Sequence, residues 1–177
     1  SQTYSEFEIV VVNDGSTDKT AEIVKGFIDK HKNIKLINFK KGHSDSLSRN
    51  KGTEKATGST LVFLDADAYI EKNFLREISK NIGKADAFIT INFPTSKTLI
   101  GKILSKLIGP QRKLKLKDGK IYDRKNHEEA GSYFSCISKK AFKKIGGYDK
   151  DVFYFTDGPF AQKFYEKGFK AVLVKNA

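Results

Sequence analysis

The chain contains no methionine and no tryptophan, and its 177 residues include a single cysteine, Cys136. One thiol cannot form a disulfide within the chain, so we expect a reducing compartment, the cytoplasm, and a buried, unreactive Cys136. No apolar run approaches the roughly 20 residues that a membrane-spanning helix needs. Position 1 is serine rather than methionine, and the chain runs almost directly into a strand, so we expect that an initiating segment precedes it.

Acidic residues are outnumbered, with 21 Asp and Glu against 33 Lys and Arg, which gives a formal net charge of +12. This balance favours anionic partners such as phosphorylated small molecules, nucleic acid or an anionic membrane surface. The hydrophobic fraction of 38% and the aromatic fraction of 12% are typical of a globular protein. The length fits one domain over residues 1–177.

The first half of the chain alternates between strand and helix patterns. Short apolar runs predict the strands, and apolar residues at helical spacing predict the helices between them. In the first helix, the apolar residues Ile23, Val24, Phe27 and Ile28 recur at helical spacing. The alternation predicts an α/β fold with a mostly parallel, doubly wound sheet flanked by helices. The predicted strands cover 7–12, 34–39, 61–64 and 86–93, and the helices cover 19–31, 45–57 and 71–82.

The second half of the chain, residues 94–177, is less regular than the first, residues 1–93. Residues 97–109 form an amphipathic helix pattern, and basic residues follow up to 125. This region could lie on an anionic membrane, although a core helix with a solvated loop is favoured. The remaining pattern predicts a strand over 131–138, helices over 139–149 and 156–168, and a final strand over 170–174.

Two carboxylates, Asp65 and Asp67, follow the apolar run Leu61–Leu64 directly. Within a strand they would point to opposite faces, but at a strand end both can approach one centre. Ligands bind at the carboxyl ends of strands in such sheets, and carboxylate oxygens suit Mg²⁺ or Mn²⁺. Taken alone, the pair more often marks a polar strand end with a capping carboxylate.

Three longer blocks change that balance. Together, VVNDGSTDKT, KGHSDSLSRNKGTEKATGSTLVFLDAD and GGYDKDVFYFTDGPF resemble the family 2 glycosyltransferases, over about residues 2–175. The resemblance implies a GT-A fold and metal-dependent transfer of a sugar, with inversion, from a nucleoside diphosphate sugar to an acceptor hydroxyl. It implies Mn²⁺ or Mg²⁺ as cofactor, a UDP-sugar as the commonest donor, and a glycan or lipid-linked acceptor. It also implies that residues 1–93 are the nucleotide-sugar-binding half of the domain and 94–177 the acceptor-binding half.

The resemblance also assigns roles to residues of the first two blocks. Asp14 is similar to the residue that contacts the nucleotide base, and Gly15 and Ser16 form the turn beneath the nucleotide. Arg49 is a candidate for the nucleotide pocket, because a guanidinium can pair with phosphate or bond a base. Ser48 stands where the family usually has alanine.

In the later blocks, Asp65 is similar to the ribose-contacting member of the acidic pair, and Asp67 to the member that reaches the metal and the diphosphate. Asp157 is similar to the catalytic base, although Thr156 replaces the usual glutamate before it. An aspartate there could take the proton of the attacking acceptor hydroxyl. The alternative role for Asp157 is capping the helix that follows, and the two roles are compatible.

The chain departs from the family pattern in two further ways. It lacks the strand and helix with which family members normally begin, and it lacks the Gln-x-x-Arg-Trp signature of processive synthases. A noncatalytic nucleotide-sugar or membrane-surface binding module is therefore the alternative function. Nucleic acid is not expected as a partner, since the lysines are spread over most helices and no nucleic-acid motif occurs.

Overall fold

The computed structural model describes residues 2–90, 117–126, 134, 136–152 and 156–175. The predicted helix over 97–109, most of the basic stretch that follows it and the beginning of the predicted strand over 131–138 lie outside these residues. The described strands form two sheets. In the first sheet, β1 (Ile9–Asp14) pairs in parallel with β2 (Ile34–Phe39), and Ile9 lies opposite Ile34.

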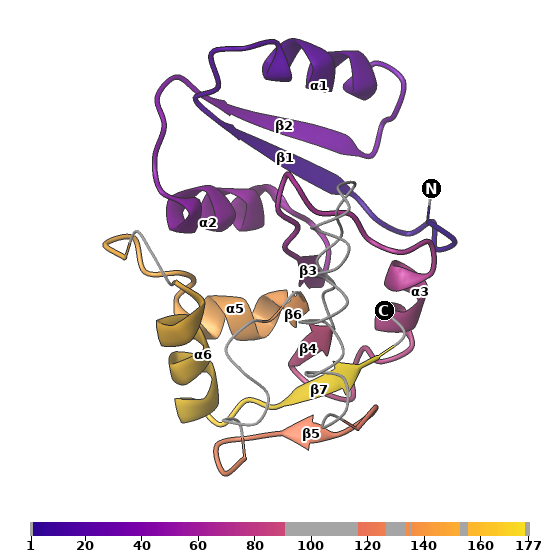
Figure 1. Cartoon of the computed structure of the whole chain (residues 1–177), viewed down its shortest axis with the longest axis vertical. Helices are drawn as coiled ribbons and strands as arrows, with labels where there is room; N and C mark the ends of the chain where they lie inside the picture. The colour runs from indigo at the N-terminus through magenta and orange to yellow at the C-terminus, as the bar shows by residue number, and fades with distance from the viewer. Residues whose placement is uncertain (1, 91–116, 127–133, 135, 153–155, 176–177) are drawn as a thin grey trace, which may run out of the picture.

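The second sheet has the strand order β3-β6-β4-β7-β5. Its members come from both halves of the chain, and β6 lies between the two strands of the first half. Figure 1 shows the two-stranded sheet at one end of the molecule and β5 at the other. The strands are β3 (Thr60–Val62), β4 (Ala87–Thr90), β5 (Ile121–Tyr122), β6 (Cys136–Ser138) and β7 (Ala171–Val174).

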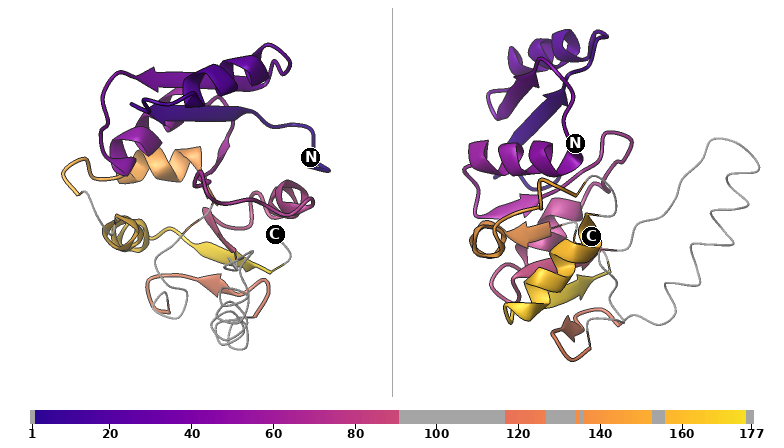
Figure 2. Two further views of the ribbon diagram at one scale, coloured as in Figure 1. Left: turned by 45° about the horizontal axis from the view of Figure 1, so that its top comes forward. Right: turned by 90° about the vertical axis from the view of Figure 1, so that its left-hand side faces the viewer.

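Five helices are described, and Figure 2 shows that they surround the sheets on several sides. Each lies within a predicted helical segment, but their ends differ from the predicted ones by up to several residues. The helices are α1 (Thr20–Ile28), α2 (Asp45–Lys55), α3 (Phe74–Ser79), α5 (Lys139–Ile145) and α6 (Asp157–Glu166).

The predicted α/β alternation is confirmed, but the strand pairing is more mixed than a mostly parallel sheet. Strand β4 pairs in parallel with β7, whereas the pairs β3–β6, β4–β6 and β5–β7 are antiparallel. The cause is the insertion of β6 between two strands that precede it in sequence. Strand β5 was not predicted, because two residues in a basic stretch are too few to show a period.

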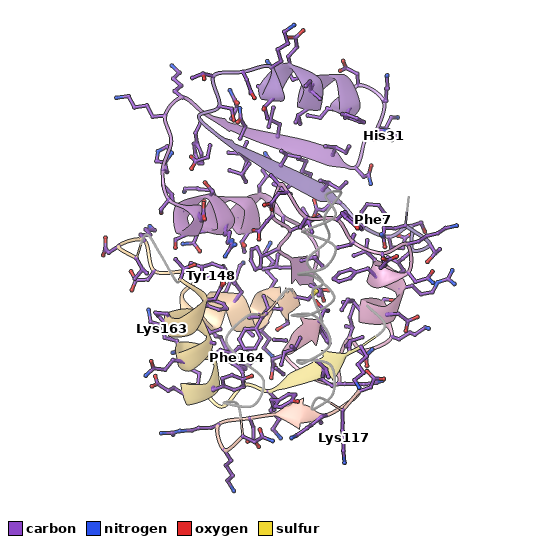
Figure 3. All side chains as sticks on the ribbon, in the orientation of Figure 1. Phe7, His31, Lys117, Tyr148, Lys163 and Phe164 are labelled. Carbon is purple, nitrogen blue, oxygen red and sulfur yellow. The ribbon has the colours of Figure 1, made fainter. Side chains whose placement is uncertain are left out.

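An aromatic cluster forms much of the core beneath α5 and α6. Tyr148 stacks on Phe160 with 4.4 Å between ring centroids, and Phe142 contacts both rings. Figure 3 shows Tyr148 between α2 and α6. Each of these three side chains is at most 3% exposed, so each contributes roughly 1.5–3 kcal/mol through burial. Cys136 is fully buried, as predicted.

The first predicted helix is confirmed, but its apolar residues are not buried. Helix α1 has no buried residue, and Ile23 and Phe27 are 58% and 52% exposed. The helix rests on β2 of the two-stranded sheet (Figure 1), which offers too narrow a surface to cover the helix. Among the described residues, no helix has the length and apolarity needed to cross a bilayer.

Candidate active site

Arg49 connects two carboxylates that are far apart in sequence. Its guanidinium donates to Asp65 Oδ1 at 3.1 Å and to Asp157 Oδ1 at 3.3 Å. The same group lies over the ring of Tyr148, 5.2 Å from the centroid, and the Arg49 side chain is only 18% exposed. Helix α2, the segment after β3 and the first residue of α6 therefore meet at one partly buried cation.

Asn50, the residue after Arg49, holds the backbone of Tyr148 in place. Its side chain donates to the carbonyl of Tyr148 at 2.8 Å and accepts from the amide of Tyr148 at 2.9 Å. Gly147 has a φ of +75°, and a Cβ there would lie 2.6 Å from Asn50 Oδ1, so only glycine fits beside the amide. Asn50 thus positions the Tyr148 ring under Arg49. Neither Asn50 nor Tyr148 was predicted as a site residue, although both lie in the blocks that carry the family resemblance.

Asp157 is the first residue of α6, and its side chain bonds Arg49 instead of capping the helix. Thr156, the residue before α6, also forms no side-chain hydrogen bond that caps the helix. The pKa of Asp157 is raised above its ordinary value by burial and by the nearby Asp65, while Arg49 opposes the rise. An aspartate with a raised pKa is a stronger base than an exposed one, which suits proton abstraction.

We expect Arg49→Met to raise the pKa of Asp157 further, because the substitution removes the cation that favours the carboxylate. An NMR titration of the Asp157 carboxyl carbon measures this directly, without any assay of activity. Arg76→Met is the matched control, because Arg76 lies on α3 and its guanidinium donates to the carbonyl of Thr3. An unchanged Asp157 pKa in Arg49→Met would contradict the pairing.

Asp14 lies at the end of β1 and forms a separate part of the site. The His43 amide donates to both of its carboxylate oxygens at 3.0 Å, and His43 Nδ1 is also 3.0 Å from Oδ1. The Phe39 ring lies beside the His43 ring, with 4.6 Å between centroids. No local sequence pattern links His43 to Asp14, which lies 29 residues earlier in the chain.

The chain bends at Gly15, directly after Asp14. Gly15 has a φ of +80°, and a Cβ there would lie 2.5 Å from the Gly42 nitrogen, so the loop after β2 excludes any side chain. The Ser16 amide donates to Asn13 Oδ1 at 3.3 Å, and Ser16 itself is exposed. No described bond joins Asp14 to Arg49, so the structure brings Arg49, Asp65 and Asp157 together and leaves Asp14 with His43.

Asp67 is exposed and lines the same groove as Asp65 and Arg49. Within the described part of the chain, no three His, Cys, Asp or Glu residues are grouped to hold a metal ion. Mg²⁺ in phosphate-transfer sites commonly takes only one or two protein carboxylates and completes its shell with phosphate oxygens and water. Asp67 fits that mode, because Asp65 is already bonded to Arg49.

Comparison of the structure with solved ones identifies the fold. S. aureus TarS superposes with a TM-score of 0.79 at 21% identity, covering 99% of this chain and 51% of that one. The mannosyltransferase PcManGT of Pyrobaculum calidifontis, solved with GDP-Man and Mn²⁺, gives a TM-score of 0.69 at 20% identity and covers 99% and 48%. The chain therefore has the GT-A fold of these two glycosyltransferases, as predicted.

Sequence comparison then gives the family. The pattern described as Glycosyl transferase family 2 matches residues 1–146, so the chain belongs to that family. An uncharacterized glycosyltransferase of Haemophilus influenzae is 39% identical over 77 residues, which are 44% of this chain and 31% of that protein. The chain thus spans about a third of this curated relative and about half of the solved chains.

Proposed function

We propose that this domain transfers a sugar from a nucleoside diphosphate sugar to an acceptor hydroxyl. The observation that carries the proposal is the bridge from Asp65 through Arg49 to Asp157 in a chain of this family. In this bridge, the Asp157 carboxylate lies next to the Arg49 guanidinium, which also bonds the exposed Asp65. A reaction with an anionic leaving group requires a cation of this kind close to the base. TarS has also been solved with UDP-GlcNAc, which supports a UDP-sugar as the donor.

In the proposed mechanism, the acceptor hydroxyl attacks the anomeric carbon as the bond to the diphosphate breaks. Asp157 takes the hydroxyl proton in that step, so the sugar is displaced directly and its configuration inverts. Asp14 and the Gly15–Ser16 turn bind the base side of the nucleotide, and Asp65 binds the ribose. Arg49 stabilises the negative charge that grows on the leaving diphosphate, since its guanidinium is held in place before the reaction.

Asp67 would hold Mn²⁺ or Mg²⁺ together with the diphosphate oxygens. When bound, such an ion neutralises charge on the leaving group. The mannosyltransferase neighbour contains Mn²⁺, which supports the choice of metal. A cytoplasmic location and a glycan or lipid-linked acceptor remain proposals that rest on the sequence.

A thermal-shift panel of nucleoside diphosphates, with and without Mn²⁺, tests donor binding. We expect at least one diphosphate to raise the melting temperature only when Mn²⁺ is present, because a ligand that binds the native state stabilises it. Asp67→Asn should remove the Mn²⁺ dependence. Asp29→Asn, which changes an exposed aspartate at the end of α1, should retain it.

The absence of a shift with every diphosphate would contradict the proposed donor site. Binding without transfer or donor hydrolysis in the wild-type protein would instead support the noncatalytic binding module. The two results separate the proposed enzyme from that alternative.

A further inference from the structure

His43 binds the Asp14 carboxylate through two different donors. The His43 backbone amide is 3.0 Å from both Oδ1 and Oδ2, whereas the ring nitrogen Nδ1 contacts only Oδ1, also at 3.0 Å. A carboxylate oxygen can only accept, so Nδ1 carries the proton of this hydrogen bond. Oδ1 therefore accepts from two donors of His43, and Oδ2 accepts from one.

This bonding leaves the two oxygens of Asp14 with different remaining capacity. A carboxylate has about four acceptor positions, two on each oxygen. His43 fills both positions on Oδ1, whereas Oδ2 keeps one that no described residue fills. A ligand that bonds the Asp14 side chain thus finds one acceptor position, on Oδ2. Without the His43 ring it would find one on each oxygen.

Neighbouring contacts hold the His43 ring in place. Figure 1 shows that the loop carrying His43 leads from the end of β2 to α2. Asp14 and Phe39 lie opposite each other at the ends of β1 and β2, and the centroid of the Phe39 ring is 4.6 Å from that of His43. Ser44 follows His43 and caps α2, because its hydroxyl accepts from the Leu47 amide at 3.2 Å. His43 is therefore fixed between a ring contact and a helix cap.

The backbone of this loop also lies directly against the turn after Asp14. A Cβ on Gly15 would be 2.5 Å from the Gly42 nitrogen and 2.6 Å from the Lys41 carbonyl carbon. The His43 amide, one residue after Gly42, is thereby held within reach of Asp14. The unequal bonding of the two Asp14 oxygens is thus determined by backbone contacts as well as by the ring.

Nucleotide bases differ in the donors that they present to a carboxylate. Uracil has one N–H on its pairing edge, N3–H, between two carbonyl groups. Guanine has two adjacent donors, N1–H and N2–H₂, which match the two oxygens of one carboxylate. TarS was solved with UDP-GlcNAc and the mannosyltransferase with GDP-Man, so the fold that they share does not by itself determine the base.

We propose that His43 determines the base specificity of this domain: by filling Oδ1 of Asp14, it favours uracil over guanine. The uracil N3–H donates to the remaining position on Oδ2. Guanine donates only one of its two N–H groups there, and the other loses its water without gaining a partner, which weakens binding. This role rests on the proposed function, in which Asp14 binds the nucleotide base.

Isothermal titration with UDP and GDP in the presence of Mn²⁺ tests this specificity. We expect the wild type to bind UDP about tenfold more tightly than GDP, which is the usual size of discrimination by one two-point contact to a base. His43→Ala opens Oδ1, so this ratio should fall several-fold. IDP, whose base lacks the 2-amino group of guanine, should bind the wild type more tightly than GDP does, and His43→Ala should reduce that difference.

Two further variants separate the hydrogen bond from a structural role of His43. His43→Asn keeps a donor at the position of Nδ1 and should retain the preference for UDP. His43→Gln places its donor at the position of Nε2 and should lose the preference. A purely structural role would weaken both nucleotides equally and leave the ratio unchanged. His31→Ala, at an exposed histidine shortly after α1, is the matched control and should retain the wild-type ratio.

The same titrations distinguish a failure of this role from a failure of the proposed function. If Asp14→Ala weakens both nucleotides but His43→Ala leaves their ratio unchanged, the role of His43 is overturned and the base site stands. Loss of the UDP preference in His43→Asn, or equal binding of UDP and GDP by the wild type, would also overturn it. If Asp14→Ala changes neither affinity, Asp14 does not bind the base, and both proposals fail.

Nitrogen-15 NMR of the imidazole rings gives a second test that needs no nucleotide. The shifts of the two ring nitrogens show which one is protonated, and we expect a proton on Nδ1 of His43. Asp14→Ala should remove this preference and leave the spectrum of His31 unchanged. An unprotonated Nδ1 in wild-type His43 would overturn the proposal, because Oδ1 would then remain open to the base.

Discussion

Asp157→Asn is expected to slow glycosyl transfer by roughly 10²–10⁴-fold while leaving donor binding unchanged. Removal of a general base typically costs that much, and an asparagine amide cannot accept the acceptor proton. Asparagine keeps the size of the side chain and an oxygen that can accept from Arg49. The effect should therefore appear in kcat, with the thermal shift by diphosphate and Mn²⁺ close to that of the wild type.

The pH dependence of transfer follows from the raised pKa of Asp157, whose main cause is burial. The base works only when ionised, so the rate should fall as the pH falls through this raised pKa and level off above it. A time course of product formation at several pH values measures this. Asp151→Asn, an exposed aspartate on the segment before α6, is the matched control. Normal turnover by Asp157→Asn would remove Asp157 as the base.

Glu8→Gln is expected to lower the free energy of unfolding at pH 7 by roughly 2–3 kcal/mol. The pKa of Glu8 is lowered to about 2 from an ordinary value of 4.5; burial opposes this shift, but hydrogen bonds from Lys35, Thr57 and Gly58 outweigh it. A difference of this size corresponds to at most about 3 kcal/mol between the two protonation states. The carboxylate also connects the beginnings of β1 and β3, so its loss loosens the link between the two sheets.

The sign of the pH effect distinguishes this mechanism from a simple loss of packing. Because the folded pKa lies below the unfolded one, the stabilisation is fully present above about pH 4.5 and is lost as the pH falls toward 2. Urea unfolding at a series of pH values should show the wild type and Glu8→Gln converging over that range. Glu6→Gln, an exposed neighbour, should match the wild type throughout. A difference for Glu8→Gln that stays constant with pH would contradict the explanation.

The two carboxylates tested in these predictions, Asp157 and Glu8, are held by different partners. Asp157 depends on Arg49, which reaches it from a helix more than a hundred residues earlier. Glu8 depends on Lys35 of β2 and on the backbone and hydroxyl donors of Thr57 and Gly58. The Arg49–Asp157 pair affects the proposed chemistry at the strand ends. The bonds of Glu8 affect how stably the beginnings of β1 and β3 are held together.

Much of the fold could be predicted because its signals are local. The apolar runs 34–39 and 170–174 and the turn at Gly15 depend on side chains within a few residues of one another. The order of the blocks was also enough to assign the family, which the match over residues 1–146 confirms.

The sequence by itself determined the order of strands and helices and the family, because periodicity and motif spacing are properties of neighbouring residues. Only the tertiary structure decided that Arg49 joins Asp65 to Asp157, that β6 inserts between β3 and β4, and that a groove separates β1 from β3. These contacts link residues distant in sequence, and their energies depend on burial and on competing partners that no short segment contains. The exposed face of α1 has the same origin, since a helical period shows which residues share a face but not whether anything covers it.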